Sequence, residues 1–210
     1  MSPSSAGSAL SRLRDRLHPL DSPPRGGGWN RAELADLLPG DHVFREAAVL
    51  VGIVDHPAAE PGVLLTRRTA TLTHHGGQIS FPGGSIDPGD DGPREAALRE
   101  AWEEIRLPQA HVEPLGYLDP YVTITGFRVL PLVARLRPGF ALTADPAEVD
   151  EVFEAPLPFL LDRRHLQRHA GDFRGRRRHY WQVCYGDHRI WGATAAMLVN
   201  LRDRIEGSGE

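Results

Sequence analysis

The residues of this 210-residue chain with the clearest chemical potential are three glutamates in one predicted helix. The segment reads Arg99-Glu100-Ala101-Trp102-Glu103-Glu104-Ile105. At the helical angle of about 100° per residue, Glu100, Glu103 and Glu104 fall within an arc of about 100°. We therefore expect an exposed acidic face. The opposite side of the helix should carry the apolar residues Ala97, Leu98, Ala101, Trp102 and Ile105.

Carboxylates gathered on one face repel each other unless a positive charge lies against them. An all-oxygen cluster suits a hard divalent cation such as Mg²⁺ or Mn²⁺. Arg99 precedes Glu103 by four residues, the helical spacing at which it can orient that carboxylate. The competing interpretation is an ordinary solvated helix face, on which glutamates are common.

The chain reaches this helix through a tight turn, Phe-Pro-Gly-Gly at 81–84, and a short acidic and glycine-rich stretch that ends at Asp90. We expect the helix to run from about residue 93 to about residue 106, with Asp91 or Gly92 as its cap. Because the turn and the start of the helix are close in sequence, we expect the acidic face of the helix to lie near the backbone of the turn.

Short apolar runs separated by Pro and Gly predict the remaining elements as buried strands. These runs cover 47–54, 62–66, 79–81, 114–118, 127–136 and 149–155. A hairpin should pair 180–185 with 188–191, and a last helix should follow at 194–205. Strands mixed with a few helices indicate one α/β or α+β domain.

The chain divides by composition into a leading segment, one domain and a tail. Leucines spaced by three and four residues, including Leu13 and Leu17, predict a short amphipathic helix near the start. With the Gly/Pro-rich linker at 22–28, this N-terminal segment spans 1–29. The folded domain then spans 30–205, and 206–210 form a flexible tail.

Composition excludes several classes of protein. All 24 Lys and Arg residues are arginine, which excludes Schiff-base enzymes, pyridoxal-phosphate enzymes and P-loops. The single cysteine, Cys184, excludes an intrachain disulfide and a Cys-rich zinc site and fits a reducing cytoplasm. No apolar run approaches the roughly 20 residues that span a bilayer. The net charge of -4 argues against nucleic acid as a partner.

Gly84, Arg99-Glu100 and Glu103-Glu104 together resemble the Nudix box, G-x5-E-x7-R-E-U-x-E-E-x-G-U, where U is a bulky aliphatic residue. Two positions depart from this pattern. The stretch from Gly84 to Arg99 is one residue longer, which leaves Asp90 or Asp91 as a substitute for the early glutamate. Arg106 stands where the box has glycine, at the C-cap of the helix.

A second resemblance lies upstream of the box. Leu-Leu-Thr-Arg-Arg at 64–68 and Gly-Gln-Ile-Ser-Phe-Pro-Gly-Gly at 77–84 are similar to the signature that precedes the box in the coenzyme A pyrophosphatases of the Nudix superfamily. Thr69 and Thr73 depart from that signature, which carries Ser or Ala and then Arg at these positions. With a further similar segment at 190–194, the resemblance covers about residues 45 to 200.

For the fold, the resemblance implies a Nudix α/β/α sandwich with a mixed β-sheet. For the activity, it implies hydrolysis of the diphosphate bond of coenzyme A (CoA) or its derivatives to 3′,5′-ADP and 4′-phosphopantetheine, with Mg²⁺ or Mn²⁺ as cofactor. The catalytic and metal-binding residues that it implies are Arg99, Glu100, Glu103, Glu104 and the carbonyl of Gly84. The substrate-binding residues that it implies are Arg68, Gly77, Phe81 and Gly83.

Two other functions stay open at this point. One is a Nudix hydrolase of another nucleoside diphosphate compound, such as ADP-ribose or a dinucleotide. The other is a non-catalytic nucleotide-binding module on the same fold, which the presence of all three glutamates and Arg99 disfavours. The partner expected in each case is a small molecule, and a homodimer is left open.

Three further groups of residues are candidates for function. Glu148 and Glu151 lie where many Nudix enzymes place an additional acidic metal ligand or base. His74-His75 lacks a matching metal-ligand spacing, so we expect loop packing instead. The segment from Arg163 to Arg178 holds seven arginines and could meet the 3′-phosphate of CoA or an RNA backbone. Our preferred interpretation is a solvated loop whose charges complement the acidic stretch at 145–154.

The acidic face predicts the effect of one substitution. Glu103→Gln should preserve the fold, because it removes repulsion from an exposed surface. It should lower the turnover rate by roughly two or more orders of magnitude, since a charged ligand or base is lost. Thermal unfolding and steady-state kinetics measure the two effects. Near-wild-type turnover by Glu100→Gln, Glu103→Gln and Glu104→Gln alike would exclude this helix as the active site.

Overall fold

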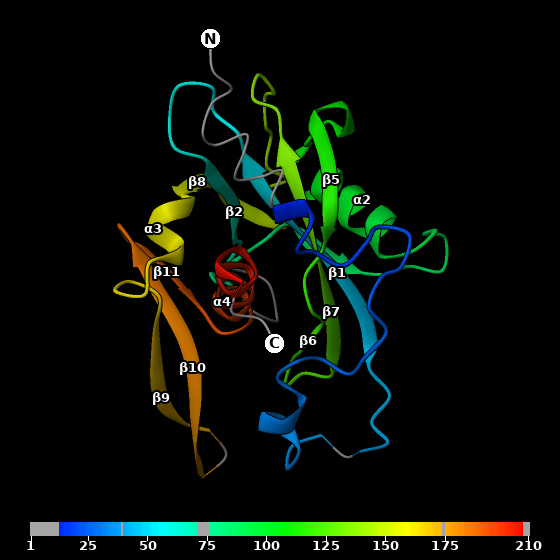
Figure 1. The fold of residues 1–210 in the computed structure, drawn as a ribbon, viewed down its shortest axis with the longest axis vertical. Coiled ribbons are helices and arrows are strands. Elements are labelled where there is room, and N and C mark those ends of the chain that lie inside the picture. The colour runs from blue at the N-terminus through cyan, green and yellow to red at the C-terminus, as the bar shows by residue number, and fades with distance from the viewer. Residues whose placement is uncertain (1–12, 39, 71–75, 174, 208–210) are drawn as a thin grey trace.

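The computed structural model describes residues 13–38, 40–70, 76–173 and 175–207, and its centre is a mixed β-sheet (Figure 1). The sheet runs in the order β3-β2-β1-β7-β5, with β4 beside β1, β6 beside β7 and β8 beside β2. Its strands are β1 (Arg45–Val54), β2 (Gly62–Arg68), β3 (Ile79–Ser80), β4 (Gly83–Ser85), β5 (Val112–Tyr117), β6 (Tyr121–Val122), β7 (Phe127–Leu136) and β8 (Val149–Pro156).

Strands β1 and β7 form the middle of the sheet and are parallel, in register from Arg45 opposite Phe127 to Val54 opposite Leu136. Both read as nearly continuous apolar runs because the sheet is covered on both faces. Helix α2 (Pro93–Ile105) packs on one face against β1, β4 and β7. Helix α4 (Ala193–Glu206) contributes to the core on the other face. The expected sandwich with a mixed sheet is confirmed.

A second, three-stranded sheet continues the structure beside α4. It consists of β9 (Gln167–Phe173), β10 (Arg176–Tyr185) and β11 (His188–Trp191), which follow the short helix α3 (Leu157–Leu161). In Figure 1, β9 and β10 project downward from the body of the molecule. The predicted hairpin between β10 and β11 is confirmed, with Tyr185 opposite His188. Two 3-10 helices, η1 (Arg31–Leu34) and η2 (Gln109–His111), complete the structure.

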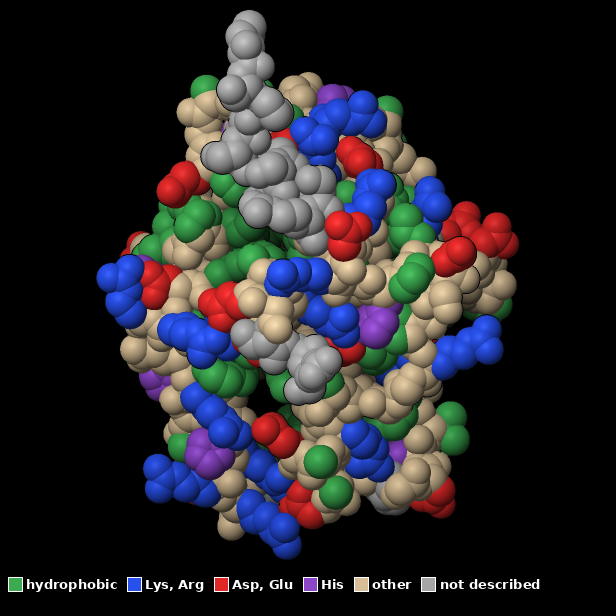
Figure 2. Space-filling model, viewed as in Figure 1, with side chains coloured by type: hydrophobic (Ala, Val, Ile, Leu, Met, Phe, Trp, Pro, Cys, Tyr) green, Lys and Arg blue, Asp and Glu red, His purple; other side chains and the backbone are tan. Residues whose placement is uncertain are grey.

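The arginine-rich segment was wrongly predicted as a loop facing the acidic stretch at 145–154. Most of it forms β9 and the start of β10, because antiparallel pairing satisfies the backbone of both strands. Figure 2 shows basic side chains gathered over this hairpin. Its arginines pair instead with acidic residues of and near η1: Arg168 with Glu33 at 3.3 Å and Arg176 with Asp36 at 2.7 Å.

The N-terminal residues that the structure describes pack on the body of the domain. Leu13 and Leu17 are buried in the core beside α4. The backbone N–H of His18 donates to the carbonyl of Tyr117 at 2.9 Å. Farther along, in the segment predicted as a linker, the carbonyl of Gly26 accepts a hydrogen bond from Arg128 at 2.9 Å. Residues 13–28 therefore pack against the domain instead of extending away from it. Within the described ranges, no helix is long and apolar enough to cross a membrane.

A polar cluster around Asp119 holds this N-terminal segment to the C-terminal helix. The Asp119 carboxylate contacts His18 Nε2 at 2.8 Å, accepts from Asn200 Nδ2 at 2.8 Å and accepts from Arg204 Nη2 at 2.6 Å. Burial raises the pKa of this carboxyl, but the hydrogen bonds from Arg204, His18 and Asn200 outweigh that effect and lower the pKa to about 2.

This lowered pKa predicts a pH-dependent loss of stability. An aspartate has a pKa of about 3.9 in an unfolded chain, so the ionised form of Asp119 favours the folded state above that pH. The contribution, about 2 kcal/mol, should disappear as the pH falls through roughly 4 to 2. Asp119→Asn should lower the free energy of unfolding at pH 7 and flatten its acid dependence in this range.

Urea unfolding followed by circular dichroism at several pH values measures this effect. Asp21→Asn, which removes an exposed carboxylate from the same N-terminal segment, is the matched control. Equal acid sensitivity in the wild type and Asp119→Asn would contradict the assignment.

Candidate active site

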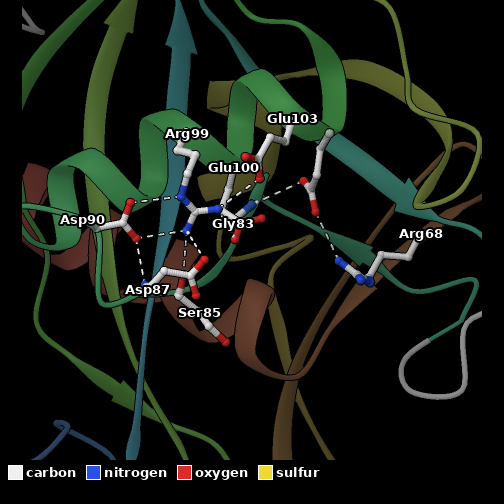
Figure 3. Close-up of polar contacts among 9 residues, drawn as sticks. Arg68, Gly83, Ser85, Asp87, Asp90, Arg99, Glu100 and Glu103 are labelled. Atoms are coloured by element: carbon white, nitrogen blue, oxygen red, sulfur yellow. Dashed lines mark hydrogen bonds and ion pairs between the residues drawn. The ribbon is translucent and has the colours of Figure 1, made fainter.

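The carboxylate of Glu104 is the point at which three parts of the chain meet. Arg68, the last residue of β2, donates from Nη1 to Glu104 Oε1 at 3.2 Å. The backbone N–H of Gly83, the first residue of β4, donates to Oε2 at 3.3 Å. Figure 3 shows Arg68 approaching the helix from the side opposite to Arg99. Glu104 therefore ties α2 to the central sheet.

Glu104 is 1 % exposed, so the prediction of a wholly exposed acidic face was wrong at this residue. Trp102, which we placed on the apolar side of the helix, is 46 % exposed, and the guanidinium of Arg106 lies 5.7 Å from its ring centroid. The buried stripe of α2 follows the spacing i, i+4, i+7, i+8. Its members are Ala97, Ala101, Glu104 and Ile105, and Ala96 beside it is also buried. Seven residues make nearly two turns, so Glu104 lies directly beyond Ala97 and is buried despite its charge.

Arg99 organises the exposed part of the acidic cluster. Its Nη1 donates to both Glu100 and Glu103, each at 3.0 Å. Its Nε and Nη2 donate to the two carboxylate oxygens of Asp90 at 2.9 and 3.0 Å (Figure 3). Nη2 also donates to the carbonyl of Ser85 at 3.0 Å. The predicted contact between Arg99 and Glu103 is therefore present.

Asp90 holds the arginine of the acidic helix. It is one of the two residues expected to substitute for the early glutamate of the box. Its carboxylate accepts from the guanidinium of Arg99, and that hydrogen bond lowers the pKa of the Asp90 carboxyl. The side chain is 4 % exposed, which makes this two-point contact rigid. The backbone N–H of Asp91 bonds to Glu95, away from the cluster.

The buried part of the cluster carries more negative charge than its neighbours neutralise. Burial raises the pKa of Glu104 to about 7, and the charges of Glu100 and Glu148 add to this effect against the charge of Arg68. Burial also raises the pKa of Glu100, although its hydrogen bond with Arg99 opposes the rise. A cation placed among these carboxylates would relieve both penalties.

The donor atoms of the cluster fit a hard divalent cation. Glu100, Glu103 and Glu104 offer only oxygen ligands, as Mg²⁺ and Mn²⁺ prefer. In the described part of the chain, no three acidic, histidine or cysteine side chains are placed so that they could hold a metal ion as they stand. Arg99 and Arg68 occupy carboxylate oxygens of the cluster, so binding a cation requires these side chains to share or release them.

The two glycines of the turn are required for different reasons. A Cβ on Gly84 would overlap the carboxylate of Glu100, because the backbone of the turn lies directly against that side chain. Gly83 has φ of 154°, and a Cβ there would lie 2.6 Å from Cα of Val49 in β1. The missing side chain of Gly84 therefore leaves room for the Glu100 carboxylate, whereas that of Gly83 leaves room for the neighbouring strand β1.

The structure separates the two additional acidic candidates. The backbone carbonyl of Glu148 accepts from the N–H of Thr69 at 2.9 Å, directly after Arg68, and the charge of Glu148 raises the pKa of both Glu100 and Glu104. Glu151 faces other partners: its Oε2 lies 3.0 Å from Arg67 and its Oε1 lies 3.1 Å from Nε2 of His188. Glu148 is therefore the candidate that belongs with the acidic helix.

The other predicted site residues either lie away from the acidic cluster or fall outside the described residues. Phe81 is 2 % exposed and packs in the core, so its side chain is not brought to the acidic cluster. Gly77 lines a separate hollow on the edge of the molecule. His74-His75 and Thr73 lie outside the described residues.

The acidic helix, clamped by Arg99, faces the glycine turn on a mixed sheet, as the resemblance to the Nudix box leads us to expect. A family model described as the NUDIX domain matches residues 44–170, a range that includes the turn and the helix. The chain therefore belongs to the Nudix family, and it is a Nudix hydrolase.

Relatives of known sequence agree with this assignment. The chain is 41% identical over 162 residues to a protein of Photorhabdus laumondii subsp. laumondii named "Uncharacterized Nudix hydrolase NudL", covering 77% of this chain and 86% of the relative. It is 42% identical over 164 residues to the Escherichia coli K12 protein of the same name, covering 77% and 83%. A solved MutT/nudix family protein from Enterococcus faecalis has a TM-score of 0.50 at 16% identity, covering 99% of this chain and 76% of that one, which shows likeness of fold alone.

The adjacent glycines predict opposite outcomes of the same substitution. Gly84→Ala should preserve the fold, because the Glu100 side chain can move away from the new methyl group. Displacing that carboxylate should lower the turnover rate by on the order of 100-fold. Gly83→Ala should destabilise the fold by about 2–4 kcal/mol, because the methyl group meets fixed backbone at an unfavourable φ.

Thermal unfolding and Mn²⁺ titration calorimetry on both variants test this contrast. We expect Gly84→Ala to melt within a few degrees of the wild type with weakened Mn²⁺ binding. A stable, fully active Gly84→Ala would contradict the role assigned to the close approach of Gly84 and Glu100.

Proposed function

We propose that this Nudix hydrolase cleaves the diphosphate bond of CoA or a CoA derivative, releasing 3′,5′-ADP and the corresponding 4′-phosphopantetheine. The observation that carries the proposal is the 3.2 Å contact between Arg68 and Glu104. It joins the upstream segment, which is similar to the coenzyme A pyrophosphatase signature, to the acidic helix that resembles the Nudix box. The two resemblances thus meet in one site.

The substrate assignment is supported by the way the upstream segment surrounds the cluster. Residues 64–68 form most of β2, and residues 77–84 lead through β3 into the turn that faces Glu100 and Glu104. A guanidinium has several N–H donors, and the one described contact with Glu104 leaves others for a phosphate. We therefore retain Arg68 as a candidate for binding substrate phosphate while it positions Glu104.

Glu100, Glu103 and Glu104, with the carbonyl of Gly84, are the residues that would hold Mg²⁺ or Mn²⁺. When bound, such a cation neutralises the charge of a diphosphate and makes water more acidic. The chain's own residues supply orientation and proton transfer. Arg99 fixes Glu100 and Glu103, and a glutamate of the cluster or Glu148 accepts the proton of the attacking water.

The setting of the reaction follows from the same proposal. The substrate is a small molecule, and neither nucleic acid nor a membrane is required. The single cysteine, Cys184, is consistent with a reducing cytoplasm. A homodimer is compatible with the proposal, and size-exclusion chromatography with light scattering determines the oligomeric state.

Product identity tests the proposed bond cleavage. Incubation with CoA and Mg²⁺ or Mn²⁺ should yield 3′,5′-ADP and 4′-phosphopantetheine, with ¹⁸O from labelled water in only one of the two products. We expect cleavage at the diphosphate because a cation can bind neighbouring diphosphate oxygens and stabilise the leaving phosphate without a general acid. Mass spectrometry of the products locates the label, and Glu103→Gln serves as the inactive control.

A panel with ADP-ribose and a diadenosine polyphosphate separates the alternatives. Strong ADP-ribose hydrolysis with CoA untouched would transfer the assignment to another nucleoside diphosphate. Release of inorganic phosphate and dephospho-CoA would refute diphosphate cleavage altogether.

A further inference from the structure

A hollow of about 360 Å³ lies where the second sheet meets the edge of the central sheet. It is formed by the end of β2, the turn before β3 and the strand β11, which packs against β3. Its volume falls in the range typical of small-molecule sites. The residues that matter for its chemistry are Arg67, Gly77, Asp187, Arg189 and Trp191.

Trp191 lines one side of this hollow, and two further aromatic rings support it. Trp191 is 36 % exposed, although large aromatic side chains usually bury more of their surface. The ring of Tyr180 meets it edge to face at 5.8 Å between centroids, and His169 stacks on Tyr180 at 5.9 Å. These neighbours hold the indole in a fixed plane while leaving it accessible. A nucleobase can stack on such a surface.

The positive charge of the hollow is incompletely neutralised. Arg189 donates to Gln182 Oε1 at 2.7 Å and to the hydroxyl of Tyr180 at 3.5 Å, and its guanidinium lies 5.0 Å from the Trp191 ring centroid. Across the described residues, no carboxylate pairs with Arg189. Arg67 shares Glu151 with His188. Asp187 also lines the hollow and would repel an anion, so the anion should lie nearer to Arg189 and Arg67.

The arginine-rich hairpin differs from this hollow in its charge balance. Arg168, Arg176 and Arg178 are paired with Glu33 or Asp36. Arg163 and Arg164 are paired with Glu206 and Asp162. An anion would have to displace a carboxylate at each of these positions. At Arg189 it would displace only a neutral amide, which costs less.

The hollow is connected to the acidic cluster by the backbone. Arg67 and Arg68 are adjacent in β2, so their side chains point to opposite faces of the sheet. Arg68 reaches Glu104, whereas Arg67 reaches the hollow. From Gly77, the chain runs through β3 to Gly83, a span of at most about 20 Å. The two places therefore lie on opposite faces beside the edge strand β3, and a substrate that occupies both must be extended and pass around this edge.

We propose that this hollow binds the phosphorylated nucleoside end of the substrate, with the base on Trp191 and a phosphomonoester at Arg189 and Arg67. This inference deepens the proposed function and rests on it for the identity of the substrate. In this proposal Trp191 binds the base. Arg189 selects substrates that carry a phosphate in addition to the diphosphate, as CoA does at its 3′ position.

The test compares CoA with dephospho-CoA, which lacks only the 3′-phosphate. The wild type should prefer CoA in kcat/KM by about tenfold or more, the value expected for a charge-assisted hydrogen bond. Arg189→Gln should raise KM for CoA by a similar factor and KM for dephospho-CoA by much less, so that the preference for CoA is lost. Trp191→Ala should raise KM for both substrates, and Trp191→Phe should restore it.

Arg177→Gln is the matched control, because it removes the same charge from an exposed position of β10 outside the hollow. Its kinetic constants should equal those of the wild type. If Arg189→Gln keeps the full preference for CoA, or if Arg177→Gln loses it equally, the proposal is refuted while CoA hydrolysis itself stands.

Binding without turnover separates this proposal from the proposed function. Calorimetry in EDTA should show 3′,5′-ADP binding about tenfold or more tightly than AMP, and Arg189→Gln should remove the difference. If CoA is not hydrolysed but this difference is present, the proposed function fails and the hollow remains a site for phosphorylated nucleosides. Equal binding of both nucleotides by the wild type would overturn the hollow's role.

Discussion

Burial of the Glu104 carboxylate is the constraint on which the site depends. A buried charge is costly unless hydrogen bonds and opposite charges compensate it. Arg68 from β2 and the N–H of Gly83 supply that compensation, and both come from the central sheet. The apolar stripe of α2 and the polar contacts of Glu104 therefore require the same placement of the helix on the sheet.

The charge of Glu104 is compensated only in part by its neighbours. Arg99 is committed to Asp90 and to the outer carboxylates, so it does not neutralise Glu104. Glu100 and Glu148 increase the cost of ionising Glu104. This negative charge in a rigid frame supports the proposal that the cluster binds a small, highly charged cation.

The strand β2 links the acidic cluster to the hollow at the edge of the sheet. Arg67 and Arg68 alternate between its two faces, so one strand supplies an arginine to each place. The packing of β11 against β3 forms the hollow and leaves Arg189 with neutral partners. In the β9–β10 hairpin, by contrast, acidic residues of the N-terminal part balance the arginines. Charge balance, and not arginine density, distinguishes a candidate binding surface here.

Local sequence patterns were sufficient to predict most of the elements. The long strands read as apolar runs between Pro and Gly, and the predicted range 127–136 coincides with β7. The predicted ends of α2 were also correct, since Gly92 precedes it and Arg106 follows it in a left-handed conformation. The strands β4, β6 and β9 were missed. They are very short or rich in polar residues, and only pairing with a neighbouring strand makes them strands.

The sequence by itself determined which residue types could do chemistry and how they are spaced: the three glutamates, the arginine beside them and the glycine turn that precedes them. It could not decide which glutamate is buried, because a helix has no inside until it packs against something. Nor could it pair Arg68 with Glu104, Asp90 with Arg99 or Glu151 with Arg67 and His188. Those partners are separated along the chain, and only the packing of the sheet, the helix and the second sheet brings their charges within contact distance.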